Sequence, residues 1–477
     1  MKRTKQDLLF AAGVLGVFGA GVAAGRMLVR PQPADTTLPR ASLLDTLALS
    51  LDVVAPTLAK GVIIRRPPVV ALAERLELDR RAVRRMQALR ARYGPGPLML
   101  RLPIRRQAVV LAPEHVRRVL DETPEPFAAA SSEKRAALAH FEPQGVLVSQ
   151  GAERADRRRF NEGVLEHERA VHHLADSFAA KIDEETAHIM DRARERGELD
   201  WDAFASGWYP LVRRVVFGDG ARDDQELNDM TVQLRRAANW AFLHPKKRSV
   251  QTRFFARIRD YLDRAEAGSL AAVAARMPAT GKTQPHQQVP QWLFAFDAAG
   301  MATFRALALL ASHPQYAERV RAGLRTHGGE RRHDLPLLRA TVLEALRLWP
   351  TTPAILRQTT AATDWERGRM PAGTGILLFA PFFHRDDERL PYADRFTPEL
   401  WLDEGKVEFE HRDWPLIPFS GGPATCPARN LVLMLTSMML AALVEDTSFR
   451  LAPGRELDPA RLPGTLDNYR LRFRFVD

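Results

Sequence analysis

The chain has 477 residues, of which 45% are hydrophobic and one is cysteine, and its formal net charge is +11 at pH 7. This length is enough to bury a core that needs no disulfide or structural metal, and one cysteine excludes an internal disulfide or a site built from several thiolates. The basic excess is spread along the chain without a dense basic tract or interleaved aromatic residues, so we expect no nucleic-acid partner. An acidic protein or an anionic membrane surface fits this charge better.

The N-terminus departs from a globular pattern. Residues 8–25, LLFAAGVLGVFGAGVAAG, are uncharged and follow the basic start MKRTKQD. As a helix they would span about 27 Å, close to the ~30 Å of a bilayer's hydrocarbon core. Residues 1–29 are therefore predicted to be an apolar anchor, and a cleaved signal peptide is the alternative. The positive-inside rule places the body outside the cytoplasm, whereas the chemistry inferred below favours a cytoplasmic body, so the side of the membrane stays open.

Prolines and periodicity divide the rest of the chain. The prolines of RPQPADTTLPR indicate a linker, predicted over residues 30–65, and residues 66–477 are predicted to form one domain. Most of this domain has the periodicity of amphipathic helices, and only short runs such as TGILLFAPFF are typical of strands. The pattern predicts a mainly α-helical fold with small β-sheets. The long amphipathic stretches cover residues 164–197, 224–267 and 290–312.

The lone cysteine lies in FSGGPATCPARN, residues 419–430. Most lone cysteines are small buried hydrophobes. Here the Gly-Gly-Pro sequence predicts a tight turn that a flat ligand can approach closely, and the apolar run after it predicts a helix that begins near Pro427. The N-terminus of a helix favours a thiolate over a thiol, and the thiolate binds metals or attacks carbon. Cys426 is therefore predicted to be a ligand or a nucleophile.

This loop resembles the haem-binding loop of the cytochrome P450 family. Phe419, Gly422 and Cys426 match its phenylalanine, glycine and cysteine in spacing. The resemblance, which extends over residues 70–475, implies a cytochrome P450 fold of the bacterial type with a single large haem domain. It implies haem b as the cofactor and Cys426 as the axial ligand of its iron, with Phe419 and Gly422 in the loop that binds the haem.

The stretch FDAAGMATFRALALLA, residues 296–311, resembles the central helix of the same family, which crosses the distal face of the haem. Gly300 and Thr303 match its motif. The resemblance implies that small residues leave room for the haem and for oxygen, and that the threonine handles oxygen and protons. The position that usually holds a proton-relaying acid is Ala302, a departure from the family. The predicted catalytic positions are Thr303, Ala302 and Gly300.

The family also has a buried Glu-Arg-Arg network beneath the cysteine loop. Glu344 and Arg347, three residues apart in EALR, and Arg395 in ADRF resemble it. An exposed pair of this kind contributes only about 0.2–0.5 kcal/mol. The leucines around this pair predict burial and a structural role. His384 is expected to pack or to donate or accept hydrogen bonds, because no partner lies at a spacing typical of metal ligands.

Cations that bind the haem propionates are implied by two further matches. Arg158, in ERADRRRF, lies in the best register of three adjacent arginines, and Arg357 lies in ILRQTT. Arg154 stands where a tryptophan or histidine is usual, and the third usual cation is replaced by Ala424. Anchoring is therefore expected to rely on Arg158 and Arg357.

The resemblance implies a monooxygenase that inserts one oxygen atom of O2 into an apolar organic substrate, with Phe296 and Ile355 among its pocket walls. No flavin or iron–sulfur segment remains in the chain, so we expect electrons from a separate ferredoxin or flavodoxin-type donor with its reductase. Two alternatives stay open: a peroxide-driven peroxygenase, which needs no relayed proton, and a haem-binding protein without turnover. We expect a monomer that is associated with a membrane through residues 8–25 and is otherwise cytoplasmic.

Overall fold

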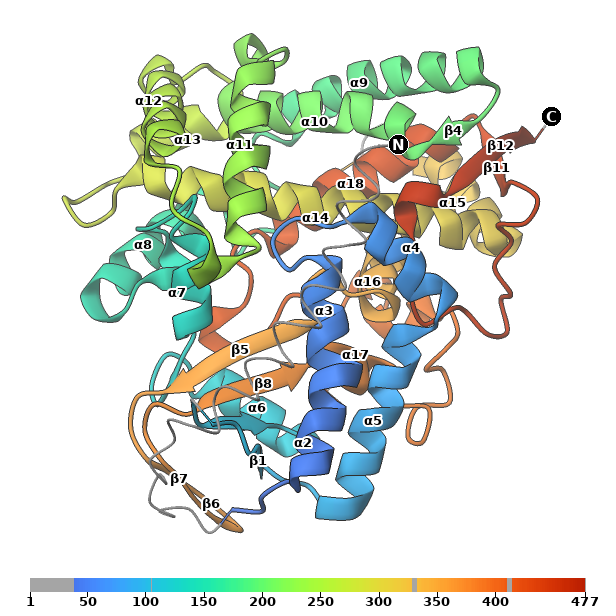
Figure 1. Cartoon of the computed structure of the whole chain (residues 1–477). Coiled ribbons are helices and arrows are strands. Elements are labelled where there is room, and N and C mark those ends of the chain that lie inside the picture. The colour runs from blue at the N-terminus through green and yellow to red at the C-terminus, as the bar shows by residue number, and fades with distance from the viewer. Residues whose placement is uncertain (1–37, 104, 328–332, 410–413, 477) are drawn as a thin grey trace.

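A long helix, α14 (Pro285–Ser312), crosses the middle of the molecule, and most other helices gather around it (Figure 1). The computed structural model describes residues 38–103, 105–327, 333–409 and 414–476. Helix α14 is apolar on nearly all sides, and such a helix is stable only inside a core. Among the described residues it is the one helix long and apolar enough to span a membrane, but 72% of its apolar stretch is buried inside the protein.

The core forms where α14 packs against three long helices, two of which also pack against a fourth. Helix α18, which follows the cysteine loop, buries 14 of its 16 residues. Its sequence RNLVLMLTSMMLAALV explains this burial, because only its first two residues are strongly polar. The three partners of α14 are α10 (Trp201–Phe217), α16 (Pro336–Leu348) and α18 (Arg429–Val444), and α9 (Ala175–Arg196) packs against α10 and α18.

The other helices surround this core. They are α4 (Pro67–Arg75), α5 (Leu78–Tyr93), α6 (Pro113–Asp121), α7 (Ser132–Leu138), α8 (Gly151–Val164), α11 (Gln225–Ala238), α12 (Arg248–Arg264), α13 (Leu270–Arg276), α15 (Pro314–His327) and α17 (Ala380–His384).

The sheets are small. The largest lies in the lower half of Figure 1, at the level of α2, α3 and α5, and has the strand order β1-β2-β8-β5-β3, with β2 and β8 parallel and β5 and β8 antiparallel. A three-stranded sheet, β11-β12-β4, lies near the C-terminus. The predicted mainly helical fold with small sheets is confirmed. The strands of these two sheets are β1 (Leu98–Met99), β2 (Gln107–Val109), β3 (Phe127–Ala128), β4 (Leu199–Asp200), β5 (Ala354–Thr359), β8 (Gly375–Phe379), β11 (Ser448–Leu451) and β12 (Arg472–Val476).

Two antiparallel ribbons complete the strands. They are β6 (Thr363–Trp365) with β7 (Gly368–Met370), and β9 (Leu402–Asp403) with β10 (Lys406–Val407).

The N-terminal part differs from the predicted linker. Within residues 30–65 the chain forms α2 (Leu43–Leu49), the π-helical turn η2 (Ser50–Val54) and α3 (Ala55–Lys60), which pack against α5. Ser42 explains the start of α2, because its hydroxyl accepts a hydrogen bond from the backbone N–H of Asp45 at 3.0 Å. Residues 1–37, which include the predicted anchor, lie outside the described residues.

Candidate functional site

The cysteine loop is folded by its own backbone. The N–H of Cys426 donates to the carbonyl of Phe419 at 2.9 Å, and the N–H of Arg429 donates to the carbonyl of Cys426 at 3.2 Å. Helix α18 begins at Arg429, two residues after the predicted start at Pro427. The cysteine is a free, partly buried residue just before this helix. The structure thus places the sulfur next to a helix N-terminus, as the sequence predicts.

The protonation of Cys426 differs from the sequence-based argument. Burial raises the pKa of the Cys426 thiol, and this effect exceeds the opposing influence of the Ala428 backbone N–H and the charges of Arg158 and Arg429. The protein surroundings alone therefore favour the thiol at neutral pH. A bound metal ion reverses this preference, because a coordinating thiol loses its proton.

Gly422 has a packing role in the loop. Its backbone has φ +60, and a Cβ atom there would lie 2.2 Å from the carbonyl oxygen of Leu120, at the end of α6. Only glycine permits this contact without a shift of backbone. The Gly-Gly-Pro sequence predicts the close approach of a flat ligand, whereas the contact observed at the Cα of Gly422 is with α6.

The contacts of the three adjacent arginines on α8 show which of them reaches the cysteine loop. Arg158 donates from Nη1 to the carbonyl of Thr425 at 2.6 Å and from Nε to Glu162 at 2.5 Å. Arg157 instead donates to the carbonyl of Lys282, and Arg159 to that of Pro278. Arg158 is therefore the arginine in the predicted register, next to the cysteine loop.

A second cation lies on the other side of the loop. Arg357, on β5, is 2% exposed and donates to the hydroxyl groups of Thr123 at 3.1 Å and Ser420 at 3.2 Å. Burial, together with the charge of Arg154, lowers the pKa of Arg357 to about 10. Its hydrogen bonds hold the guanidinium beside the loop without neutralising its charge.

Lys134, on α7, belongs to the same group of cations, although no sequence motif indicates it. Burial and the charges of Arg357 and Arg154 lower the pKa of Lys134 to about 7. Arg154 donates to the carbonyl of Pro423 at 3.4 Å, and its own pKa is lowered by burial and by Arg158. Among the described residues, none of the ion pairs involves Lys134, Arg154 or Arg357.

This arrangement fits the group that the resemblance implies. Partly buried cations that lower one another's pKa values call for an anion among them, because an unpaired charge is costly to bury. Haem b carries two carboxylates on one edge, and its iron takes a cysteine ligand. The four cations beside the loop would bind those carboxylates, and Cys426 would bind the iron. The donor set therefore fits haem.

On α14, the motif residues are tightly packed. Thr303 is fully buried, and its hydroxyl donates to the carbonyl of Ala299 at 2.9 Å. A Cβ atom on Gly300 would lie 2.5 Å from the indole nitrogen of Trp208, which itself donates to the carbonyl of Phe296 at 2.9 Å. The contact shown for Gly300 is thus packing against α10, and its predicted catalytic role stays a prediction.

The buried charge network is confirmed in part. Glu344 and Arg347 are fully buried and form a bidentate pair at 2.6 and 2.8 Å. The side chain of Arg395 is exposed, and this residue contributes its carbonyl, which accepts from Arg347 at 2.6 Å. The prediction that Arg395 is a third buried side chain of the network is wrong. The indole N–H of Trp401 donates to the Glu344 carboxylate instead, at 2.8 Å. His384 has the expected hydrogen-bonding role, accepting from the N–H of Ile417 at 2.9 Å.

A polar cluster on α14 lies one turn before the threonine motif. Asp297 accepts from Arg235 at 2.6 Å and from the hydroxyl of Tyr209 at 2.8 Å. Nearby, Glu142 is fully buried, and burial raises its pKa well above the usual value despite the charge of Arg235. The two partners of Asp297 come from α10 and α11, which are far away in the sequence. No local pattern therefore indicates this cluster.

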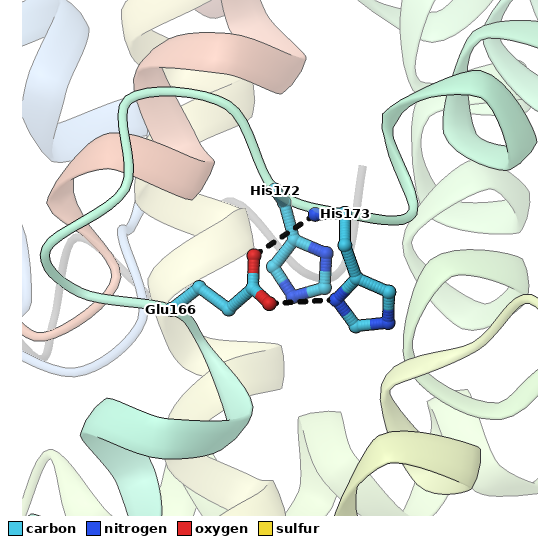
Figure 2. A group of neighbouring side chains, drawn as sticks. All are labelled: Glu166, His172 and His173. Carbon is cyan, nitrogen blue, oxygen red and sulfur yellow. Dashed lines mark hydrogen bonds and ion pairs between the residues drawn. The ribbon is translucent and has the colours of Figure 1, made fainter.

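Another group has the spacing of metal ligands. Glu166, His172 and His173 lie within 4.8 Å of one another, in the loop between α8 and α9 (Figure 2). His172 is buried and uses both ring nitrogens: one contacts the carbonyl of Val164 at 3.1 Å, and the other accepts from the N–H of Leu174 at 3.1 Å. Glu166 accepts from the backbone and the ring of His173. These hydrogen bonds indicate that the three side chains stabilise the loop between α8 and α9.

Comparison with known proteins agrees with this site. Residues 288–466 match the cytochrome P450 family. Cyclooctat-9-en-7-ol 5-monooxygenase of Streptomyces melanosporofaciens is 31% identical over 194 residues, 38% of this chain and 42% of that protein. Ferruginol synthase of Salvia pomifera is 33% identical over 150 residues, 30% of this chain and 33% of that protein. The chain thus matches less than half the length of these curated relatives.

Solved structures show the same fold over most of the chain. A cytochrome P450 described as CYP102L1 has a TM-score of 0.69 at 18% identity, covering 94% of this chain and 100% of the other. The retinoic acid bound cyanobacterial CYP120A1 has a TM-score of 0.66 at 17% identity, covering 82% and 93%. Residues 288–466, which include the cysteine loop, thus match the cytochrome P450 family, and the chain as a whole has the cytochrome P450 fold.

Proposed function

We propose that this protein is a haem-thiolate monooxygenase that inserts one oxygen atom of O2 into an apolar organic substrate. The observation that carries the proposal is the cysteine loop with Lys134, Arg154 and Arg357 beside it, three cations that form no ion pair among the described residues, and with Arg158, which pairs with Glu162. Haem with a thiolate ligand supplies an oxidant for unactivated C–H bonds. The name of the Streptomyces relative, a monooxygenase of cyclooctat-9-en-7-ol, supports the same class of reaction.

The chain's own residues would hold and orient the cofactor. Arg158 and Arg357 are fixed by hydrogen bonds to the loop and to neighbouring hydroxyl groups, so their guanidinium groups are oriented before a carboxylate binds. Lys134 adds a third positive charge and would become more basic when an anion enters. The hydroxyl of Thr303 donates to the carbonyl of Ala299, a bond that it could exchange for one to a ligand bound beside α14.

The assignment of the sulfur is testable by spectroscopy. In the reduced protein with carbon monoxide, we expect the strongly red-shifted Soret band of thiolate-bound haem, and Cys426→His should abolish it. Retention of that band in the variant would refute the role of Cys426. Arg357→Ala should also reduce the haem retained per chain, whereas Arg159→Ala, on the side of α8 that contacts Pro278, should leave it unchanged.

A peroxide-driven reaction is the second candidate, and two observations favour it. Ala302 cannot relay a proton. Asp297 is already bound to Arg235 and Tyr209, so both of its oxygens are held by groups other than a proton-relay partner. Product from hydrogen peroxide alone would support this candidate. Substrate-dependent NAD(P)H consumption with a reductase would support the monooxygenase, and the absence of both reactions would leave a haem-binding protein.

We also propose that electrons come from a separate acidic ferredoxin or flavodoxin-type donor on the cysteine side. Arg429 lies at the start of α18 with its guanidinium 3.8 Å from the ring centre of Phe409, and Arg412 lies outside the described residues. Exposed charges are screened beyond about 8–10 Å at ordinary ionic strength, so reduction should slow as salt increases. A salt-independent rate would contradict this docking by charge.

Finally, we propose that residues 8–25 anchor the chain to a membrane and that the body is monomeric. The anchor is inferred from the uncharged, apolar sequence of residues 8–25, and the monomeric state stays a prediction. Leu15→Asp with Phe18→Asp should release the full-length protein from membranes into the soluble fraction. Retention of this variant in the membrane fraction would show that another part of the chain holds it there.

A further inference from the structure

The helical segment of residues 43–60, formed by α2, η2 and α3, buries Leu49 and Val53 in the core and also exposes apolar side chains on its outward side. Its four most exposed residues are all leucines: Leu43 at 62%, Leu44 at 78%, Leu47 at 47% and Leu51 at 48%. Three of them are spaced by four residues and the remaining one is adjacent, so they form a stripe along one side of the helix. A surface helix of a soluble protein normally shows the opposite arrangement.

The inward side of the same segment is partly polar. Thr46 and Thr57 are buried, and Thr46 accepts from the N–H of Arg101 at 3.2 Å. Lys60 is buried and pairs with Asp79 of α5 at 2.5 Å. These contacts fix the rotation of the helix against the body, so the leucines cannot turn inward without breaking a buried ion pair. Figure 1 shows α2 and α3 as one rod beside α5.

Arginines surround the stripe. Arg92 is 63% exposed and pairs with Asp45, and Arg81 is 62% exposed and pairs with Asp52, two acids on the stripe's own segment. Arg40 and Arg101 are exposed just before α2 and next to Thr46. Apolar side chains bordered by long cationic ones are typical of helices that lie in the interface of an anionic membrane.

We propose that α2 and η2 lie in the interface of an anionic lipid membrane, with the four leucines in the boundary of the acyl chains. The choice of lipid rather than a second copy of the chain rests on the arginine border and on position in the sequence. The uncharged residues 8–25 end 17 residues before Leu43, so a membrane that holds them lies within reach of the stripe. The proposal thus extends the proposed anchoring and can fail independently of it.

The test uses the full-length chain in two forms, the native sequence and the anchor variant Leu15→Asp with Phe18→Asp. In each, the stripe is changed to Leu43→Gln, Leu44→Gln, Leu47→Gln and Leu51→Gln, because glutamine retains helix propensity. The matched control changes exposed apolar residues elsewhere: Leu72→Gln, Leu76→Gln and Val476→Gln, at 41%, 49% and 45% exposure. Circular dichroism and the haem absorbance establish that each protein is folded.

Binding to vesicles of phosphatidylcholine with phosphatidylserine is measured by flotation. In the anchor-variant background we expect the stripe variant to bind about 100-fold more weakly, from partial burial of four leucines, and the control set to change binding less than about 3-fold. Vesicles of phosphatidylcholine alone should also bind more weakly. Equal binding with and without the stripe leucines would overturn the proposal, whatever the anchor does.

Two further outcomes identify another occupant and would also overturn the proposal. If the stripe variant loses a dimer in sedimentation but keeps its vesicle binding, the stripe contacts a second copy. If the anchor substitutions destabilise the protein in buffer only when the leucines are present, residues 8–25 fold back onto the stripe. Loss of the native protein's membrane binding on anchor substitution alone concerns the anchor and leaves the stripe's contribution measurable.

Discussion

Removal of one carboxylate should show how strongly the buried charge network holds the cysteine loop. Glu344 accepts four hydrogen bonds: two from Arg347, one from the indole of Trp401 at 2.8 Å, and one from the N–H of Thr397 at 2.8 Å. Arg347 donates to four carbonyls besides, among residues 384–395. Glu344→Ala leaves the guanidinium charge uncompensated and two other donors without an acceptor.

The magnitude follows from burial. Both side chains are fully buried, and breaking such a pair typically costs about 3–5 kcal/mol in free energy of unfolding. Urea unfolding followed by circular dichroism and by the haem absorbance measures it. We expect the haem signal to be lost at lower urea in the variant, because Arg347 also binds the carbonyl of His384, whose ring accepts from Ile417 just before the cysteine loop.

A matched control is available on α15. Glu318 and Arg321 have the same spacing of three residues, at 3.2 Å, but the glutamate side chain is 59% exposed. Glu318→Ala should cost no more than about 0.5 kcal/mol. If Glu344→Ala and Glu318→Ala cost the same, burial does not set the strength of the Glu344 network, and the structural role argued for it is refuted.

Three further predictions concern single positions. Gly422→Ala should lower the free energy of unfolding by about 2–4 kcal/mol and reduce haem retention, since its Cβ would meet the carbonyl of Leu120. The control Gly405→Ala, where φ is +79 and no atom lies near the new Cβ, should cost about 1 kcal/mol. Unfolding curves and the haem bound per chain measure both variants. Burial raises the pKa of Asp467 to about 6, so folding favours its protonated form and the free energy of unfolding falls as the pH rises from about 4 to 6. Asp467→Asn should therefore stabilise the protein by up to about 3 kcal/mol above about pH 6 and little below about pH 4. Urea unfolding at a series of pH values measures this difference. Ala302→Asp should raise, and Thr303→Ala lower, the product formed per NAD(P)H oxidised, because positioned proton transfer contributes about 10²–10⁴ in rate; tight coupling in the native protein would contradict this.

The helices were predictable where their periodicity is strong, but their ends were not. The stretch 164–197 is interrupted by the loop that begins at Leu165, in which Glu166 has φ 47, and the stretch 224–267 is two helices with Pro245 between them. An amphipathic period continues through such breaks because both helices face one core. The segment 43–60 was missed because it is apolar on its exposed side as well as on its buried side, although Ser42 is a recognisable N-cap.

The candidate site was predictable where one short motif carries it. Cys426, Phe419 and Gly422 lie within eight residues of one another, so their spacing alone describes the loop. Lys134 could not be found in this way, because its significance depends on charges brought near it from β5 and α8. The part that Trp401 plays in the Glu344 network, in place of the exposed side chain of Arg395, could not be predicted either. It depends on the path of the chain after His384.

The packing of α14 bears on which oxidant the protein uses. Asp297 is the only acid in the sequence of this helix, and both of its oxygens accept hydrogen bonds. Freeing it for proton transfer would cost the ion pair with the buried Arg235, which then faces the apolar ring of Phe294 without a counter-charge. Asp297 is therefore better explained as the partner that keeps Arg235 in the interior than as a proton donor. If Asp297→Asn destabilises the fold but leaves the product formed per NAD(P)H unchanged, the helix has no acid of its own to relay protons. A reaction that takes both protons and electrons from hydrogen peroxide then becomes the simpler account of the same site.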